Sequence, residues 1–460
     1  MAAQDEHPRQ PLNLLGAGDA IADCVHCGFC LPACPTYVLW GEEMDSPRGR
    51  IHLADQVRAG GPLEGATVKH FDRCLSCMAC VTACPSGVRY GEIIEAARAD
   101  VEQATDRALP DRLARSAIFS LFPYPRRLKI ARAALGLAQL TGIQSALRRP
   151  GVSRHLPAML RAVDSVAPPV SRLVRLPVRL PATGPRRGVV GLLTGCVQSV
   201  FFSATNAATA RVLAAEGFDV VVPKGQGCCG ALSSHSGRTS EAARFATKTI
   251  ETFKSAGVEF IVVNAAGCGS AMKDYSRLFP AQTSGSVAAD WLSTRTRDLS
   301  ELLASFGTRA RRHPVPLKIA YHDACHLAHA QRIRAQPRDL LQEIPELQLY
   351  EIHDDLCCGS AGIYNLVQPD AAKELGDRKA AAVMATGAEV VVTTNPGCMM
   401  QMRSALLRAG STIRILPLAQ VLDISIRGGA EVENVRSRSG PKGATGLPPQ
   451  STRSGRGRTS

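Results

Sequence analysis

Long apolar runs are missing from this 460-residue sequence, in which 45% of the residues are hydrophobic and only 5% are aromatic. No stretch reaches the roughly 18 consecutive apolar residues of a membrane-spanning helix. The opening residues, MAAQDEHPRQ, contain no apolar signal core, so we do not expect secretion. We expect a cytoplasmic protein, with peripheral attachment to the inner face of the cell membrane as an open alternative. The chain is too long for one core, and two or three domains are expected.

A dinucleotide-binding fingerprint is also absent. No G-x-G-x-x-G follows an expected strand, so we expect no flavin or nicotinamide site on this chain. If the chain takes part in oxidoreduction, the hydride chemistry then belongs to a cofactor on a partner protein.

Acidic residues are scarce in one segment only. Between Arg107 and Arg187 there are 16 Lys and Arg residues against two acids, Asp111 and Asp164, and this segment accounts for the whole net charge of +14. Because the excess is local, we expect no nucleic-acid partner. The stretch SAIFSLFPYPRRLKIARAALGLAQLTG combines aromatic and basic residues on a helical pattern. It suits either an anionic membrane surface or a linker that packs on its neighbours and docks an acidic partner.

Cysteine is abundant, with 16 residues, and in a chain not expected to be secreted this indicates metal or redox ligands. The runs DCVHCGFCLPACPTY and RCLSCMACVTACPSG both follow the C-x2-C-x2-C-x3-C-P spacing of two-cluster bacterial ferredoxins, in which the fourth cysteine serves the other cluster. A pair of zinc sites would not need the third C-x2-C step or the proline. We assign one [4Fe-4S] cluster to Cys24, Cys27, Cys30 and Cys84, and a second to Cys74, Cys77, Cys80 and Cys34.

The other eight cysteines form an internal repeat with an offset of 129 or 130 residues. The first set is Cys196, Cys228, Cys229 and Cys268, and the second is Cys325, Cys357, Cys358 and Cys398. Short buried-strand patterns precede these cysteines in a β-α-β-α-β order, which predicts parallel sheets. Sites in such sheets form beyond the carboxyl ends of the strands, so each half should gather four thiols at one edge.

Four thiols at a sheet edge could bind an iron–sulfur cluster, bind zinc or act as a redox dithiol, and these alternatives stay open. A disulfide between adjacent cysteines is strained and is not expected. The second half is the better candidate for a redox centre because YHDACHLAH surrounds its first cysteine, whereas the first half has only LTGCVQS. Ligation and a structural role in the turn both remain open for the histidines. The residues in question are His322, Asp323, His326 and His329.

Together these patterns predict an α+β multidomain protein. The expected parts are an α-helical two-[4Fe-4S] ferredoxin-like domain, a basic helical linker, two α/β repeats with parallel sheets, and a disordered Gly/Ser/Pro/Arg-rich tail. Their boundaries are 16–104, 105–187, 188–312, 313–427 and 428–460.

This arrangement resembles the iron–sulfur subunit of glycolate oxidase, most closely in YHDACHLAHAQRIRAQPRDLL, CCGSAGIYNLVQPDAAKELGDRKA and TTNPGCMMQM. The resemblance covers residues 16–427. It implies an oxidoreductase subunit that takes electrons from FAD-containing dehydrogenase subunits, where glycolate is oxidised, and passes them to a quinone or another membrane acceptor.

Wider relatives leave alternatives open. The layout is also similar to lactate-utilisation iron–sulfur proteins, to the corresponding subunit of anaerobic glycerol-3-phosphate dehydrogenase, and to heterodisulfide reductases. In the last group the repeat ends in C-x2-C and its five cysteines bind an unusual cluster, but here Ala271 and Gln401 replace the final cysteine. A thiol or disulfide reductase centred on the repeats is therefore the alternative function.

Overall fold

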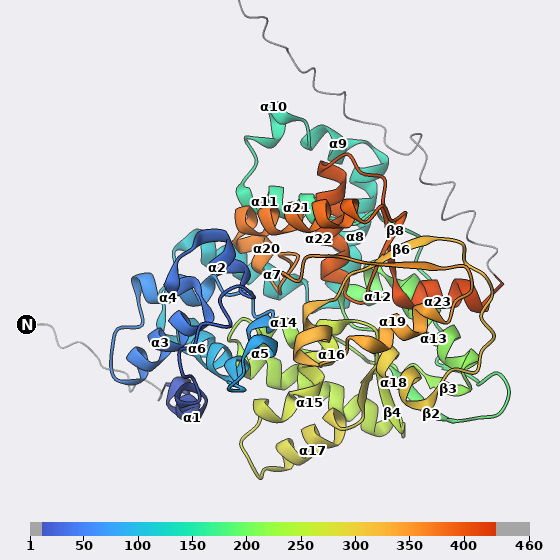
Figure 1. Ribbon diagram of the computed structural model, residues 1–460, viewed down its shortest axis with the longest axis horizontal. Coiled ribbons are helices and arrows are strands. Elements are labelled where there is room, and N and C mark those ends of the chain that lie inside the picture. The colour runs from blue at the N-terminus through green and yellow to red at the C-terminus, as the bar shows by residue number, and fades with distance from the viewer. Residues whose placement is uncertain (1–11, 429–460) are drawn as a thin grey trace, which may run out of the picture.

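The computed structural model describes residues 12–428. The tail predicted to begin at residue 428 lies outside the described residues except for its first position. Within the described range, no helix is long and apolar enough to cross a membrane. The predicted fold class is confirmed: a helical domain and linker precede two α/β units with parallel sheets (Figure 1).

The N-terminal domain consists of short helices around the two cysteine runs. Proline occupies the first turn of α2 and of α3, where its missing N–H costs nothing. Apolar side chains and the thiols of Cys74 and Cys80 share one core. The elements are η1 (Asn13–Ala17), α1 (Gly18–Ala22), α2 (Pro35–Trp40), η2 (Glu43–Asp45), α3 (Pro47–Arg58), α4 (Gly65–Asp72), α5 (Ala79–Ala83) and α6 (Tyr90–Ala104).

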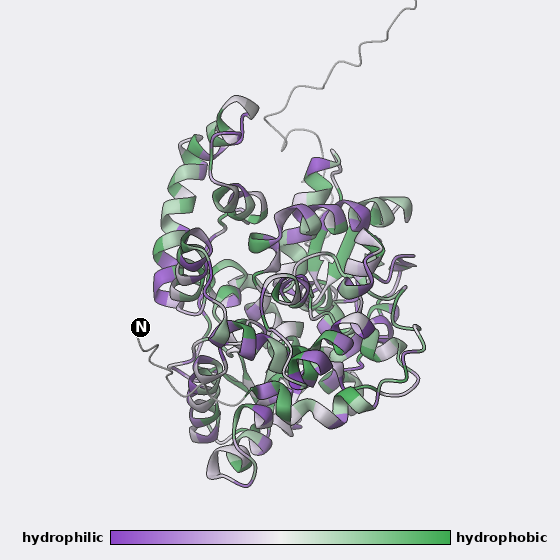
Figure 2. Cartoon of the chain, turned by 90° about the vertical axis from the view of Figure 1, so that its left-hand side faces the viewer, coloured by the Kyte–Doolittle hydropathy of each residue, from purple (hydrophilic) through white to green (hydrophobic). Residues whose placement is uncertain are grey.

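The basic segment is helical, as predicted, from Leu109 to Val166, and it contacts both repeats. Helix α8 packs against α12 of the first repeat, and α11 packs against α20 and α22 of the second. Figure 2 shows part of this linker standing away from the body as an arm with several apolar residues. Its helices are α7 (Leu109–Leu121), α8 (Pro125–Leu140), α9 (Ile143–Leu147), α10 (Pro150–Ser153) and α11 (Ala158–Val166).

The first repeat is built on a five-stranded sheet in the order β1-β3-β2-β4-β5, parallel except for β1 at the edge. Its strands are β1 (Arg179–Leu180), β2 (Gly188–Leu192), β3 (Phe218–Val221), β4 (Phe260–Val263) and β5 (Thr296–Asp298). Its helices are α12 (Val197–Phe201), α13 (Ser203–Ala215), α14 (Ala231–Ser234), α15 (Thr239–Ser255), α16 (Ala266–Lys273), η3 (Tyr275–Leu278), α17 (Ser284–Ser293) and α18 (Leu299–Phe306).

The second repeat has the same central order, β7-β6-β8-β9, with every pair parallel. Its strands are β6 (Lys318–Tyr321), β7 (Gln348–Glu351), β8 (Val390–Thr393) and β9 (Arg414–Pro417). Its helices are α19 (Ala335–Gln342), α20 (Tyr364–Val367), α21 (Pro369–Ala385), α22 (Pro396–Arg408) and α23 (Leu418–Ile426), with one π-helical turn, η4 (His326–Ala330), after the first cysteine.

The sequence predicts three strands in each repeat, and the structure adds β5, β9 and the edge strand β1. Strand β5 has only three residues, Thr-Arg-Asp, and therefore shows no apolar run. The two repeats form one body because a single apolar core joins residues of both sheets with α13, α18, α19 and α23. Strand ends of the two repeats also meet directly, since the Ala266 N–H donates to the Thr394 carbonyl at 3.1 Å.

Candidate redox centres

The two ferredoxin-type loops share an unusual backbone. His26 and Gly28 in the first loop have φ values of 54° and 86°, and Ser76 and Met78, fifty residues later, have 52° and 62°. Three of these four positions hold side-chain-bearing residues in the left-handed region, which is costly unless the surroundings impose it. The repeated turns bend each loop around its thiols. His26 is exposed in this turn.

The first thiol group lies near the surface. Cys24, Cys27, Cys30 and Cys84 line one small cavity, together with Cys80. Cys27 is exposed, and the other three of the group are half-buried. Cys84 thus lies beside the first loop although it comes from the second run.

The second thiol group is buried. Cys34, Cys74, Cys77 and Cys80 are all shielded from solvent. Burial, reinforced by nearby thiolates that include Cys34, raises the pKa of Cys77 and of Cys80 well above the ordinary value. Such thiols ionise when a metal ion supplies the compensating positive charge. Buried cysteines gathered in this way fit an iron–sulfur cluster.

The second loop packs directly on the second repeat. Cys77 and Leu75 share one apolar cluster with Cys325, Cys357 and Tyr364. After burial itself, the charge of Cys325 is the largest influence on the pKa of Cys77. The buried thiol group of the N-terminal domain therefore lies against a thiol group from a segment about 250 residues away.

The thiols of the first repeat meet at the ends of β2, β3 and β4, as predicted. The Sγ atoms of Cys196 and Cys228 are 3.8 Å apart, and the Gly230 N–H donates to Cys228 Sγ at 3.3 Å. Hydrogen bonds from Cys228 and Cys268 lower the pKa of Cys229 well below its ordinary value. The Cys229 thiol thus lies between those of Cys228 and Cys268.

The second repeat brings its thiols together in the same way and adds histidine. The Sγ atoms of Cys325 and Cys357 are 4.0 Å apart. His322, Cys358 and Cys398 are buried, and their ligand atoms lie within 4.8 Å of one another. Hydrogen bonds from Cys357 and Cys398, with a further one from His322, lower the pKa of Cys358 well below its ordinary value. This donor set suits a soft or borderline metal ion.

The structure separates the four polar candidates around Cys325. His322 joins the thiols, and His326 Nδ1 lies 3.6 Å from Cys325 Sγ. Asp323 instead forms an ion pair with Arg338 at 2.7 Å, and His329 Nδ1 lies 2.9 Å from the Thr82 hydroxyl of the N-terminal domain. Only the two histidines His322 and His326 therefore touch the thiol site.

Gln401 stands at the place of the fifth cysteine, and its side chain bonds to the backbone rather than to the thiols. Gln401 is buried, and its side-chain amide donates to the Ala372 carbonyl at 2.6 Å.

Two arginines that the sequence did not single out, Arg50 and Arg98, flank Cys74. An arginine that the fold buries has no distinguishing sequence signal, because the surrounding residues come from distant segments.

Comparison with known proteins agrees with the division of the chain into a ferredoxin-type domain, a linker and two repeats. Residues 20–88 match the 4Fe-4S dicluster domain, residues 190–273 and 319–403 match the cysteine-rich domain twice, and residues 110–167 match the linker region of the glycolate oxidase iron–sulfur subunit. A probable glycolate oxidase iron–sulfur subunit of Bacillus subtilis is 37% identical over 87% of this chain and 93% of its own length. The chain belongs to the family of glycolate oxidase iron–sulfur subunits. The Escherichia coli subunit is 36% identical over 87% of this chain and 94% of its own length.

Membership of this family confirms three predictions. They are the resemblance inferred from the cysteine patterns, the presence of iron–sulfur cofactors, and the role as an electron-transfer subunit of an oxidoreductase. A shorter relative, lactate utilization protein A of an Exiguobacterium species, is 28% identical over 52% of this chain and 98% of its own length. The glycolate oxidase subunits therefore match a much larger part of this chain than that lactate protein does.

Proposed function

We propose that this subunit receives electrons from an FAD-containing partner that oxidises glycolate or a related 2-hydroxy acid, and delivers them toward a quinone-type acceptor. Membership of the glycolate oxidase iron–sulfur subunit family indicates the class of complex. The clusters supply one-electron chemistry when bound, and the chain's own residues position them, exclude water from one of them and connect that one to the second repeat.

We assign the ligands in a crossed arrangement. Cys24, Cys27, Cys30 and Cys84 would hold one cluster, which is supported by their common cavity. Cys34 would join Cys74, Cys77 and Cys80, which is supported by its influence on the pKa of Cys77 and Cys80. The Cys34→Ser variant should then lose the EPR signal of the buried cluster and keep the other. Loss of the surface cluster alone would contradict the crossed assignment.

Cys77 shares one apolar cluster with Cys325 and Cys357, and this observation supports an electron path between the second thiol group and the second repeat. We propose that electrons enter at the more exposed first cluster, pass to the buried second one, and leave through the second repeat. Cys325, Cys357, Cys358 and Cys398, with His322, would hold an iron–sulfur cluster or zinc there. Cys196, Cys228, Cys229 and Cys268 form the corresponding but less elaborate site.

The division of labour is tested by purifying the chain alone and with its flavoprotein partner. We expect at least about eight irons, from the two [4Fe-4S] clusters, and no flavin in the chain alone. Glycolate-dependent reduction of both clusters is expected only when the partner is present. Glycolate oxidation by the isolated chain with an artificial acceptor would overturn the proposal. Reduction by lactate or glycerol 3-phosphate in place of glycolate would keep the electron-transfer role and change the substrate.

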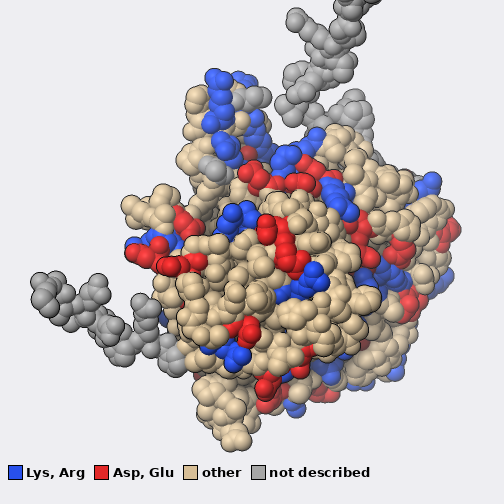
Figure 3. Space-filling model, turned by 60° about the vertical axis from the view of Figure 1, so that its left-hand side comes forward, with Lys and Arg blue, Asp and Glu red and all other residues tan. Residues whose placement is uncertain are grey.

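The linker supports a membrane contact. Of the twenty large apolar side chains exposed in the described residues, twelve lie within residues 105–187, including Ile130 at 73% and Leu140 at 88% exposure. Figure 3 shows Lys and Arg gathered on the lobe that projects from the body. The three acids of this segment each pair with an arginine: Asp106 with Arg112, Asp111 with Arg115 and Asp164 with Arg148. Apolar residues among unpaired cations suit an anionic lipid surface.

Flotation with vesicles of phosphatidylglycerol and phosphatidylcholine tests this contact. The double change Ile130→Asp and Leu140→Asp should abolish binding, whereas Val287→Asp, at an exposed valine of the first repeat, should not. Equal binding by both variants would contradict the membrane contact. Loss of the flavoprotein partner from the linker variant, with vesicle binding intact, would assign the surface to a subunit interface instead.

A further inference from the structure

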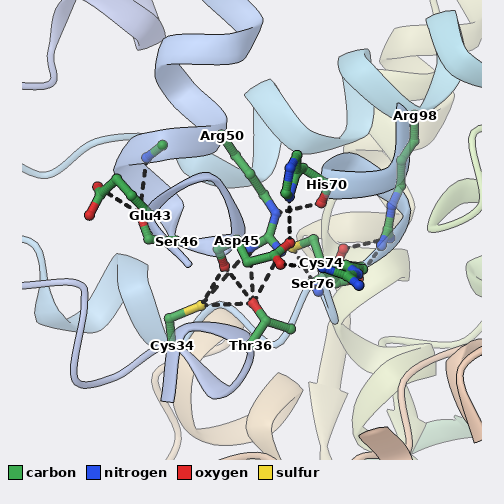
Figure 4. A network of polar contacts seen from close by, with 12 residues as sticks. Cys34, Thr36, Glu43, Asp45, Ser46, Arg50, His70, Cys74, Ser76 and Arg98 are labelled. Atoms are coloured by element: carbon green, nitrogen blue, oxygen red, sulfur yellow. Dashed lines mark hydrogen bonds and ion pairs between the residues drawn. The ribbon is translucent and has the colours of Figure 1, made fainter. Parts of the chain in front are cut away.

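Arg50 is an arginine enclosed within the N-terminal domain beside the second thiol group. It lies on α3 and is 1% exposed. Its guanidinium donates to the His70 carbonyl at 2.7 Å, to the Thr36 hydroxyl at 3.1 Å and to Asp45 Oδ1 at 3.2 Å (Figure 4). One of its nitrogens also lies 3.9 Å from Cys34 Sγ. A full charge is therefore held out of water against a predicted cluster ligand.

The charges around Arg50 do not balance within the protein. Asp45 is completely buried, but its carboxylate oxygens also lie 2.7 Å from the Arg73 guanidinium and 2.8 Å from His70 Nδ1. One carboxylate thus faces two guanidinium groups, one of which is fully buried. Burying an unmatched charge is expensive, so a further negative group is needed next to Arg50.

The cysteines of the second thiol group provide that negative charge. Cys34 Sγ is 3.2 Å from the Thr36 hydroxyl that Arg50 contacts, and Cys74 accepts a hydrogen bond from the Ser76 N–H at 3.3 Å. The guanidinium of Arg98 donates a hydrogen bond to the Cys74 carbonyl oxygen, so a second arginine lies beside this cysteine. Cys34 and Cys74 are thus the two thiols of this group that face positive charge.

The first thiol group has a different arginine, which serves as a natural comparison. Arg48 lies two residues away on the same helix and donates to the His26 carbonyl at 3.3 Å. Its side chain is 31% exposed and forms an ion pair with Glu43 at 2.6 Å. Its charge is matched and open to water, so its field at the first thiol group is screened.

We propose that Arg50 is a built-in counter-cation that raises the reduction potential of the cluster held by Cys34, Cys74, Cys77 and Cys80. The inference rests on the proposed ligand assignment and deepens the proposed electron path. One electron taken up from the flavin partner adds one negative charge at this site, without bond changes in the chain. A buried positive charge stabilises the reduced state, because net charge and hydrogen bonds to sulfur set cluster potentials. Arg50 lies beside the cysteine ligands rather than the cluster itself, so it acts through those ligands.

An EPR-monitored potentiometric titration of the isolated, anaerobically reconstituted chain tests this. In Arg50→Gln, we expect the midpoint of one of the two cluster signals to fall by about 59 mV or more, a tenfold change in the ratio of reduced to oxidised cluster. Arg50→Lys should retain most of the wild-type midpoint. Arg48→Gln should leave both signals unchanged.

A second variant distinguishes electrostatics from a loosened structure. Asp45→Asn removes the negative partner of Arg50 and should move the same midpoint upward, opposite to Arg50→Gln. Shifts in the same direction for the two variants, or equal shifts of both signals, would overturn the proposal. If Arg50→Gln does not assemble its clusters, an upward shift in Asp45→Asn together with a near-wild-type midpoint in Arg50→Lys decides the question. The titration uses neither glycolate nor a partner, so failure of the proposed function would leave its result standing.

Discussion

The first and second Cys-Cys-Gly repeats present four thiols on nearly the same backbone, but they surround those thiols differently. In the first repeat Leu193 occupies the position that His322 holds in the second, and two of the four thiols are half-buried. In the second repeat all four are buried, histidine reaches them, and Cys77 of the ferredoxin-type domain packs against them. The comparison teaches that the fold supplies the thiols, whereas neighbours from other segments give the two thiol groups different surroundings.

The largest expected difference is in turnover. Replacing Cys357 and Cys358 together with Ser should lower the glycolate-dependent activity of the complex by at least about 100-fold, because the exit from the second cluster is lost. Both ferredoxin-type EPR signals should persist. The matched change of Cys228 and Cys229 removes the same number of buried thiols and should lower activity by less than about tenfold. Equal losses in the two variants would break the distinction between the repeats.

Stability should also differ between the two Cys-Cys-Gly turns. Gly230 and Gly359 have φ values of 85° and 87°, but an added Cβ would lie 3.0 Å from the Ala242 carbonyl oxygen in the first turn and 2.7 Å from the Ala372 carbonyl oxygen in the second. We expect Gly359→Ala to cost about 3 kcal/mol and Gly230→Ala about 2 kcal/mol in unfolding free energy. Urea denaturation of the two variants measures this, and a larger cost at Gly230 would contradict the geometry.

Metal binding provides a smaller and more specific contrast. His322→Leu gives the second repeat the residue type of the first and removes one candidate ligand beside Cys358 and Cys398. We expect about tenfold weaker metal binding at this site, measured as metal retained per chain during chelator competition. His329→Leu is the control, because His329 contacts Thr82 rather than the thiols. Unchanged metal retention in His322→Leu would remove His322 from the site.

The smallest effect concerns the contact that fastens the second repeat to the N-terminal domain. Thr82→Val removes the hydroxyl that lies 2.9 Å from His329 Nδ1. The unfolding free energy should fall by about 1 kcal/mol, as for one hydrogen bond. Thr82→Ser keeps the hydroxyl and should stay close to the wild type. If the serine variant is as unstable as the valine variant, the methyl group rather than the hydrogen bond holds the contact.

Local spacing explains what the sequence could predict. The C-x2-C steps place thiols on one side of a loop, and cysteines that follow short apolar strands must meet where parallel strands end, so the grouping of both sets of thiols could be anticipated. The contact between Cys77 and Cys325, the burial of Arg50 and the selection of His322 over Asp323 depend on packing between distant segments. No periodicity encodes such contacts. Strand β5 escaped prediction because three residues are too few to show a pattern.

Single-turnover reoxidation of the clusters tests the central claim most directly, namely that electrons leave through the second repeat. The complex is reduced with glycolate, mixed with a water-soluble quinone, and quenched for EPR at successive times. In Cys325→Ser, which alters the thiol beside Cys77, both clusters should become reduced but reoxidise at least about 100-fold more slowly than in the wild type. Cys196→Ser, the matched change in the first repeat, should reoxidise at the wild-type rate. Fast reoxidation in Cys325→Ser, or slow reoxidation confined to Cys196→Ser, would contradict the account.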